Sequence, residues 1–171
     1  GYCATNISFI NEHNALLDNT YRKPIGPIEF ELAFLNPIPN ATIMFKNDLI
    51  KKHDLTFNKY KSGEDYDFLI RFVLNTKSKG VFLSEKLYSY RILKDSLFHS
   101  NKKSTINLSY KLGLEYFKNI YPEAEKNSYN LLQRFINKNI AIDDYKGKLY
   151  FYYKYMVQCE KFFDWGKYDI E

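Results

Sequence analysis

The stretch YKSGEDYDFLIRFVL, residues 60–74, decides how this sequence is interpreted, because acidic residues cluster directly before a strongly apolar run. The spacing of the apolar residues predicts a helix from Glu64 to about Thr76, with Ser62 and Gly63 placed to cap its N-terminus. Acidic side chains in the first turn of a helix are each stabilised by about 0.3–1 kcal/mol through the helix macrodipole. A capped helix is therefore a sufficient explanation of the cluster, and a metal site or a catalytic base are the alternatives.

Helical geometry gives the carboxylates different surroundings. Successive residues turn by about 100°, so Asp65 and Asp67 point to nearly opposite sides and are not expected to chelate one metal ion. Asp67 precedes Arg71 by four residues, which predicts an ion pair at the surface. Asp65 heads the apolar stripe that must face the interior, formed by Leu69, Phe72 and Val73. At this rim of the core, burial raises the pKa of Asp65 and the helix terminus lowers it, so we expect an ionised carboxylate that is usable as a base.

The composition is that of a globular protein with unusually many aromatic residues. Hydrophobic residues make up 45% and charged residues 26% of the 171 residues, and 16 Tyr with 14 Phe bring the aromatic share to 18%. A chain of this length buries about two thirds of its unfolded surface, as one domain or as a large part of one. The net charge of +5 is a mild bias toward anionic partners, which a Lys- and Asn-rich composition also explains.

Cysteine usage and the absence of targeting signals predict a cytoplasmic protein. No run of about 18 uncharged apolar residues occurs, and residues 1–9 contain no basic segment before an apolar one, so neither a transmembrane helix nor a signal peptide is expected. Cys3 and Cys159 stand alone at opposite ends of the chain, which favours reduced thiols. With no C-x-x-C motif and three scattered histidines, a zinc site is not expected.

Periodicity divides the chain into a mixed α/β part, residues 1–100, and a helical extension, residues 101–171. In the first part, extended pieces flank the polar turn at residues 11–14. Pro27 suits the first turn of a helix, and Pro37 is expected to end that helix.

The remaining α/β segments are short. Residues 41–45 indicate a strand, and residues 47–53 a short helix. KGVFLSEKLYSYRI, residues 79–92, predicts two strands joined at residues 84–86. The apolar members of these two strands are Val81, Leu83, Leu87, Tyr88 and Tyr90.

The extension carries helical spacing in three segments, residues 104–120, 122–141 and 143–165. The last segment is expected to present one apolar face. That face consists of Leu149, Tyr152, Tyr153, Met156 and Phe163.

Three motifs in order carry a resemblance to a known family. NPIPNATIMFKNDLI (residues 36–50), GEDYDFLIRFV (63–73) and LSEKLYSYRILKDSL (83–97) resemble bacterial family 2 glycosyltransferases of the inverting GT-A type. SFINEHNALLDNTYRKP (8–24) is similar to the stretch that follows the nucleotide-binding half of such enzymes. The resemblance covers about residues 4–100.

The resemblance implies a fold and an activity. The fold is α/β, a partial GT-A type that lacks the N-terminal nucleotide-binding half, over residues 1–100, followed by the α-helical C-terminal extension, residues 101–171. The complete enzyme is a hexosyltransferase that moves a sugar from a nucleotide-sugar donor to a glycan or lipid-linked acceptor with inversion. The chain by itself is expected to be inactive, because the donor site is incomplete.

The resemblance also assigns site residues. Asp65 stands where the family has the general base that deprotonates the acceptor hydroxyl, and Glu64 is its neighbour beside donor and acceptor. Arg91 is expected near the donor diphosphate, with a paired arginine at a strand edge as the alternative. Asn40 and Thr42 are expected to line the acceptor cleft.

A divalent cation, Mn²⁺ or Mg²⁺, is implied for the complete enzyme, with most of its ligands in the missing half. One departure concerns this cation. Where the family often has a histidine ligand, this sequence has Leu93, which cannot bind a metal. No metal ligand is therefore assigned to the residues present.

The aromatic, lysine-rich segment 145–168 leaves three alternatives open. It packs an aromatic face on the domain, binds the inner face of the plasma membrane peripherally, or forms a homodimer through its surplus aromatic face. A second class of function is a basic, aromatic-rich binding module for nucleic acid or a protein partner. Nucleic acid is not expected, because the basic residues are spread out and no nucleic-acid motif occurs.

Overall fold

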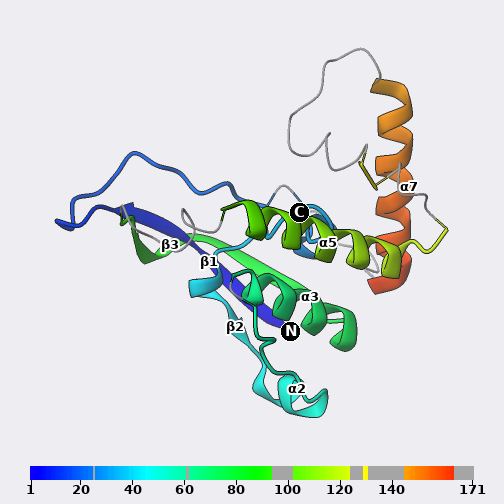
Figure 1. Ribbon diagram of the computed structural model, residues 1–171, viewed down its shortest axis with the longest axis horizontal. Coiled ribbons are helices and arrows are strands. Elements are labelled where there is room, and N and C mark those ends of the chain that lie inside the picture. Colours follow the sequence, from blue (N-terminus) through cyan, green and yellow to red (C-terminus); the bar gives the residue numbers. More distant parts are fainter. Residues whose placement is uncertain (25, 61, 94–101, 124–128, 131–144, 164–171) are drawn as a thin grey trace.

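The protein is described by a computed structural model that covers residues 1–24, 26–60, 62–93, 102–123, 129–130 and 145–163. It is a mixed α/β protein with a three-stranded sheet in the order β2-β1-β3 (Figure 1). β1 (Tyr2–Ile10) pairs in parallel with β3 (Gly80–Arg91) and antiparallel with β2 (Met44–Phe45). The helices are α1 (Ile28–Glu31), the 3-10 turn η1 (Asn40–Thr42), α2 (Asn47–Lys52), α3 (Glu64–Thr76), α5 (Lys102–Ile120) and α7 (Tyr145–Phe163).

The mixed α/β class predicted from the sequence is confirmed, and so is the predicted extent of α3. α3 and α5 lie side by side, and α7 crosses the C-terminal end of α5 (Figure 1). The stripe of Leu69, Phe72 and Val73 is fully buried in the core, as the helical spacing predicts. The GT-A type of the fold stays a prediction.

The prediction of two strands within residues 79–92 is wrong, because β3 is one continuous strand. Its pairing with β1 is irregular where a turn was expected: Leu83 lies opposite Thr5, and Lys86 opposite Asn6. Asn6 fills this gap with its side chain, whose Nδ2 donates to the carbonyl of Ser84 at 3.4 Å. The polar residues therefore form a bulge instead of a hairpin.

The apolar side chains of β3 are largely outside the core. Phe82 packs against the core. Val81, Leu83, Leu87, Tyr88 and Tyr90 are each at least 40% exposed. The sheet therefore keeps much apolar surface that the described helices do not cover.

The helix bracketed by Pro27 and Pro37 is shorter than predicted, because α1 ends at Glu31 and gives way to a turn. The carbonyl of Ala33 would find its helical partner at residue 37, but proline has no N–H to donate. The hydroxyl of Tyr129 donates to this carbonyl instead, at 2.9 Å.

Two more tyrosine hydroxyls donate hydrogen bonds to backbone carbonyls of the same segment. Tyr116 donates to the carbonyl of Glu29 at 2.7 Å, and Tyr66 donates to the carbonyl of Leu32. All these groups are buried, and a buried carbonyl without a partner costs about 1–3 kcal/mol. Hydroxyls from α3, α5 and the segment around residue 129 thus hold residues 29–33 in the core.

Close approach of α5 to this segment requires a glycine. A Cβ atom on Gly113 would lie 2.3 Å from the carbonyl oxygen of Ala33 and 2.7 Å from the hydroxyl of Tyr129. Both neighbours are fixed by the hydrogen bond that joins them. Gly113 is therefore demanded by packing and not by backbone conformation.

We predict that Gly113→Ala destabilises the protein by about 1–3 kcal/mol, as overpacking of a filled core does. Helix propensity alone would make alanine more stable than glycine by about 1 kcal/mol. A loss of stability, and not a gain, is therefore the result that supports the close approach of α5 to Ala33. Urea unfolding followed by circular dichroism measures the change. Gly26→Ala is the matched control, because nothing lies within 4 Å of a Cβ there, and equal effects of the two changes would contradict the packing described.

The described residues of the last helix agree with the predicted face at one position and disagree at another. Tyr155, Cys159 and Phe163 are buried, whereas Met156 is 41% exposed. Phe163 was predicted correctly, and the side chains of Leu149, Tyr152 and Tyr153 lie outside the described residues, as does nearly all of the predicted helix at 122–141.

α7 contacts α1 and α5, and it also reaches Lys77, the residue after α3. The ring of Tyr155 lies 5.1 Å from that of Phe30, and the ammonium of Lys77 lies over Phe162, 2.8 Å from the ring centroid. The packing alternative for this helix is thus observed for its described residues. Within the part of the chain that the structure describes, no helix is long and apolar enough to cross a membrane.

A carboxylate lies inside the core. Glu29 is 0% exposed, and its Oε1 accepts hydrogen bonds from the hydroxyl of Tyr2 at 2.9 Å and from the N–H of Gly80 at 2.6 Å. Its Oε2 is buried with no hydrogen-bond partner among the described residues. Burial raises the pKa of Glu29, because desolvation penalises the charged form.

We predict that Glu29→Gln changes the pH dependence of stability. The folded protein holds this proton to a higher pH than the unfolded chain does, so the wild type loses stability as pH rises through the raised pKa. Glutamine does not titrate, so the free energy of unfolding of the variant, measured with urea, should rise relative to that of the wild type as the pH is raised from 4 to 8. Glu160→Gln, exposed on α7, is the control. A constant difference between Glu29→Gln and wild type across this range would contradict the assignment.

Candidate active site

The N-terminus of α3 is set by Gly63, which adopts the left-handed conformation with φ of 86°. A residue with a Cβ is strained in this conformation. No side chain caps this helix, so the expected capping role of Ser62 is wrong. The hydroxyl of Ser62 instead pairs with that of Thr105 on α5, at 2.6 Å.

An open cleft of about 630 Å³ lies at this end of α3. The side chains around it come from β1, η1, β3, α3, α5 and the loops between them. The lining consists of Ile7, Phe9, Tyr21, Asn36, Ile38, Pro39, Asn40, Ala41, Ser62, Gly63, Glu64, Asp65, Tyr66, Tyr90, Thr105 and Ser109. A volume of this size is within the range of about 300–1,000 Å³ that small-molecule sites occupy.

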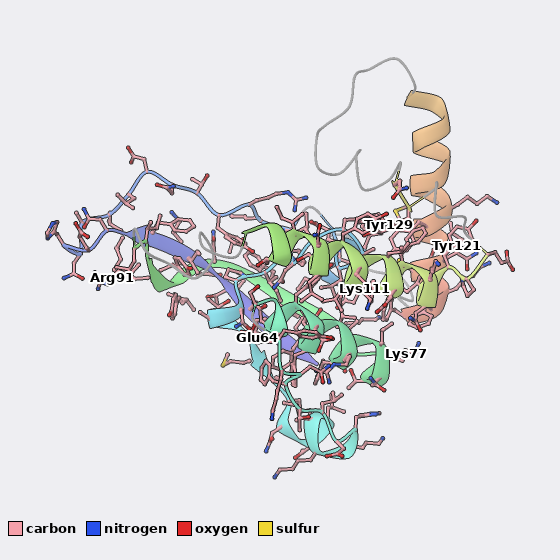
Figure 2. The ribbon with its side chains drawn as sticks, in the orientation of Figure 1. Glu64, Lys77, Arg91, Lys111, Tyr121 and Tyr129 are labelled. Atoms are coloured by element: carbon pink, nitrogen blue, oxygen red, sulfur yellow. The ribbon has the colours of Figure 1, made fainter. Side chains whose placement is uncertain are left out.

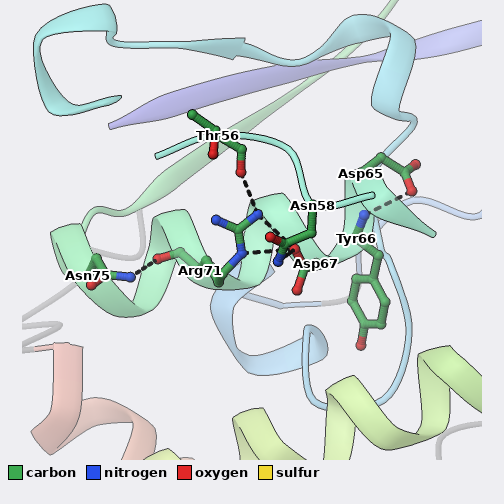
Figure 3. Close-up of polar contacts among 7 residues, drawn as sticks. All are labelled: Thr56, Asn58, Asp65, Tyr66, Asp67, Arg71 and Asn75. Carbon is green, nitrogen blue, oxygen red and sulfur yellow. Dashed lines mark hydrogen bonds and ion pairs between the residues drawn. The ribbon is translucent and has the colours of Figure 1, made fainter. Parts of the chain in front are cut away.

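Asp65 lines this cleft as a half-buried carboxylate. Its Oδ1 accepts a hydrogen bond from the backbone N–H of Tyr66 at 2.8 Å (Figure 3). Burial raises the pKa of Asp65, the hydrogen bond from Tyr66 lowers it, and the neighbouring charge of Glu64 raises it, with a net rise. Of the two opposing effects weighed from the sequence, burial is the larger.

The other expected site residues divide into two groups. Glu64 and Asn40 line the cleft with Asp65. Thr42 does not, because its buried hydroxyl is used within the fold: it accepts from the N–H of Thr5 at 3.1 Å and donates to the carbonyl of Pro39 at 2.9 Å. Thr42 therefore joins η1 to β1 and has no hydroxyl hydrogen free for a ligand.

Arg91 also lies outside the cleft lining. Its guanidinium donates to the carbonyl of Asn11 at 2.8 Å and to Oδ1 of Asn14 at 2.7 Å. Asn14 has a positive φ of 64°, so Arg91 braces a tight turn. Figure 2 shows Arg91 well apart from Glu64. These contacts match the alternative for Arg91, a paired arginine at a strand edge.

Asp67 differs from the prediction in its burial. The predicted pairing is present: Arg71 donates from Nε to Oδ2 of Asp67 at 2.8 Å, and Asn58 donates to the same oxygen at 2.9 Å (Figure 3). Asp67 is only 4% exposed, however, so an ion pair at the surface is wrong. Arg71 also donates to the carbonyl of Thr56 at 2.7 Å, which ties the loop before α3 to the helix.

We predict that Asp67→Ala lowers the free energy of unfolding by about 2–4 kcal/mol, because it leaves Arg71 without its buried partner. An exposed ion pair contributes about 0.2–1 kcal/mol. Glu115→Ala is the matched control, since Glu115 pairs with Lys111 at the same spacing with both side chains more than half exposed. Chemical denaturation of both variants measures the difference, and equal losses would contradict the burial of Asp67.

Several cleft residues were not anticipated from the sequence. Phe9 and Tyr90 come together because they are register partners on β1 and β3. Asn36 follows α1, and Tyr21 lies in the loop before it. Phe9 and Tyr21 fall in motifs that the resemblance covers, but nothing in their spacing along the chain brings them to Asp65.

The described residues by themselves form no site for the divalent cation that the resemblance implies. No group of three or more His, Cys, Asp or Glu side chains among them could hold a metal ion. Mg²⁺ requires near-octahedral oxygen coordination, and the two carboxylates of the described cleft lining, Glu64 and Asp65, do not complete it by themselves. Leu93 is exposed and supplies no ligand.

Comparisons with family models, curated proteins and solved structures gave no match to this chain, so the resemblance is carried by its own motifs.

Proposed function

We propose that this chain carries the acceptor-activating part of an inverting glycosyltransferase, with Asp65 as the general base. The observation that supports this most is the position of Asp65: a half-buried carboxylate with a raised pKa that opens into a cleft of about 630 Å³. An exposed capping carboxylate would have neither property. A perturbed titratable group in a cleft is a candidate for function.

In the proposed reaction the acceptor hydroxyl enters the cleft and gives its proton to the carboxylate of Asp65. The oxygen forms a bond to the anomeric carbon of the donor sugar from the face opposite the leaving group. The bond between that carbon and the donor phosphate breaks, and the nucleoside diphosphate leaves with the electron pair. Asp65 performs the proton transfer, and the residues that bind the donor are not assigned to the described part of the chain.

The electrostatics of Asp65 suit a base. A pKa above the ordinary aspartate value makes the ionised carboxylate a stronger proton acceptor. The N–H of Tyr66 orients the carboxylate through Oδ1, and Tyr66 is itself anchored in the core by its hydroxyl. The base therefore stands beside a fixed residue and not on a mobile loop.

We predict that Asp65→Asn, in the protein as its host expresses it, lowers sugar transfer by about 10²–10⁴-fold, the usual contribution of a general base. Transfer from radiolabelled UDP-glucose, UDP-galactose and UDP-N-acetylglucosamine to a cell-envelope extract measures it. In the wild type, transfer falls on the acid side through a pKa above the ordinary aspartate value, because only the ionised form accepts a proton.

Two controls separate catalysis from folding. Ionised Asp65 costs folding energy at neutral pH because its pKa is raised by burial, so Asp65→Asn should melt no lower than wild type at pH 7. Asp48→Asn removes an exposed acid from the first turn of α2 and should leave transfer unchanged. Near-normal transfer by Asp65→Asn with UDP-sugar binding retained would refute the assignment.

A binding module remains the alternative function. Nucleic acid would not enter the cleft through cationic contacts, because none of the described lining residues is Lys, Arg or His. Binding of single-stranded DNA that weakens steeply with salt would favour the alternative over glycosyl transfer.

A further inference from the structure

The cleft has an aromatic wall made by Phe9 and Tyr90. The two rings pack edge to face, with centroids 5.8 Å apart and planes at 73°. Phe9 is half-buried, and Tyr90 remains 42% exposed. The contact with Phe9 holds the ring of Tyr90 in place, so a ligand meets a preorganised aromatic surface.

Polar groups that can both donate and accept lie in the same lining. Asn36 and Asn40 contribute side-chain amides, and Ser109 contributes a hydroxyl. Amides and hydroxyls match alcohol groups, which also donate and accept hydrogen bonds. An aromatic surface beside amides fits a sugar ring, because the C–H groups of one sugar face pack on the negative face of an aromatic ring while the hydroxyls reach the amides.

The charge of the lining is of one sign. Glu64 and Asp65 are its only charged side chains among the described residues. Arg22 and Arg91 each follow a lining residue in the sequence, but neither lines the cleft. Arg22 is engaged by Glu31 at 2.8 Å, and Arg91 donates to the carbonyl of Asn11 at 2.8 Å. Among the described lining residues, a carboxylate or phosphate on the ligand would meet like charge and no cationic side chain.

We propose that the cleft binds an uncharged saccharide, whose ring packs on the wall of Phe9 and Tyr90, and that Glu64 and Asp65 exclude acidic saccharides. The choice of a saccharide rests on the proposed glycosyl transfer. The exclusion of acidic sugars rests on the charge of the lining alone. The acceptor class narrows accordingly from any glycan or lipid-linked sugar to one whose acceptor end carries no uronate or phosphate.

The test is binding by the full chain, measured at pH 7 by saturation-transfer NMR and titration. Maltotetraose, cellotetraose and chitotetraose are the neutral probes, and tetragalacturonate is the acidic one. We expect at least one neutral probe to bind at least 10-fold more tightly than tetragalacturonate. Failure of all three neutral probes to bind, or equal or tighter binding of tetragalacturonate, would overturn the proposal.

Variants locate the site. Tyr90→Ala should weaken the neutral probe about 10-fold, while Tyr88→Ala should not, because Tyr88 is equally exposed on β3 but lies outside the cleft lining. The double variant Glu64→Gln, Asp65→Asn should reduce the ratio of affinities for the neutral probe and for tetragalacturonate. Equal effects of Tyr90→Ala and Tyr88→Ala, or an unchanged preference in the double variant, would contradict the proposed wall or the proposed exclusion.

The outcome separates this inference from the proposed function. If neutral saccharides bind in a Tyr90-dependent way and Asp65→Asn keeps normal transfer, the binding inference holds and the general base is wrong. If Asp65→Asn abolishes transfer and the accepted sugar is acidic, the base assignment holds and the inference is wrong.

Discussion

The hydrogen bonds from three tyrosine hydroxyls to the carbonyls of residues 29, 32 and 33 are the constraint on which the structure depends. The segment that carries these carbonyls is buried and too short to satisfy them as a helix. Tyr66, the residue after Asp65, is one of the donors, so the same bond that anchors α3 also fixes its rotation about its axis. With that rotation fixed, Asp65 opens into the cleft while Asp67 turns to Arg71. Core packing and the candidate site thus share one residue.

What could be predicted from the sequence is what depends on neighbours along the chain. The extent of α3 and its buried stripe followed from helical spacing, and the pairing of Asp67 with Arg71 followed from a separation of four residues. The position of Asp65 at the rim of the core followed from the same geometry. Its role as a base, the GT-A type and the domain division stay predictions, because geometry places a carboxylate without showing what it reacts with.

What could not be predicted depends on contacts between distant segments. The burial of Asp67 needs the loop that carries Asn58, and the cleft wall needs the parallel register that brings Phe9 to Tyr90. The polar residues 84–86 have the composition of a turn. Only their pairing with β1 shows that they form a β-bulge. On α7, Met156 was predicted to pack on the domain, but Tyr155, one position earlier, is buried instead. A segment rich in tyrosine has apolar side chains on every side, so spacing alone does not show which side packs.

The docked position of α7 has a consequence for the chemistry of Cys159. This side chain is 0% exposed, so reagents do not reach the thiol in the docked state. Burial also raises its pKa, which disfavours the reactive thiolate. Oxidants and alkylating reagents reach it only when the last helix leaves the core. Cys3, half-buried on β1, has no such shield. The rate at which Cys159 is modified therefore reports how often α7 undocks from the core, so this thiol is a built-in probe of that motion.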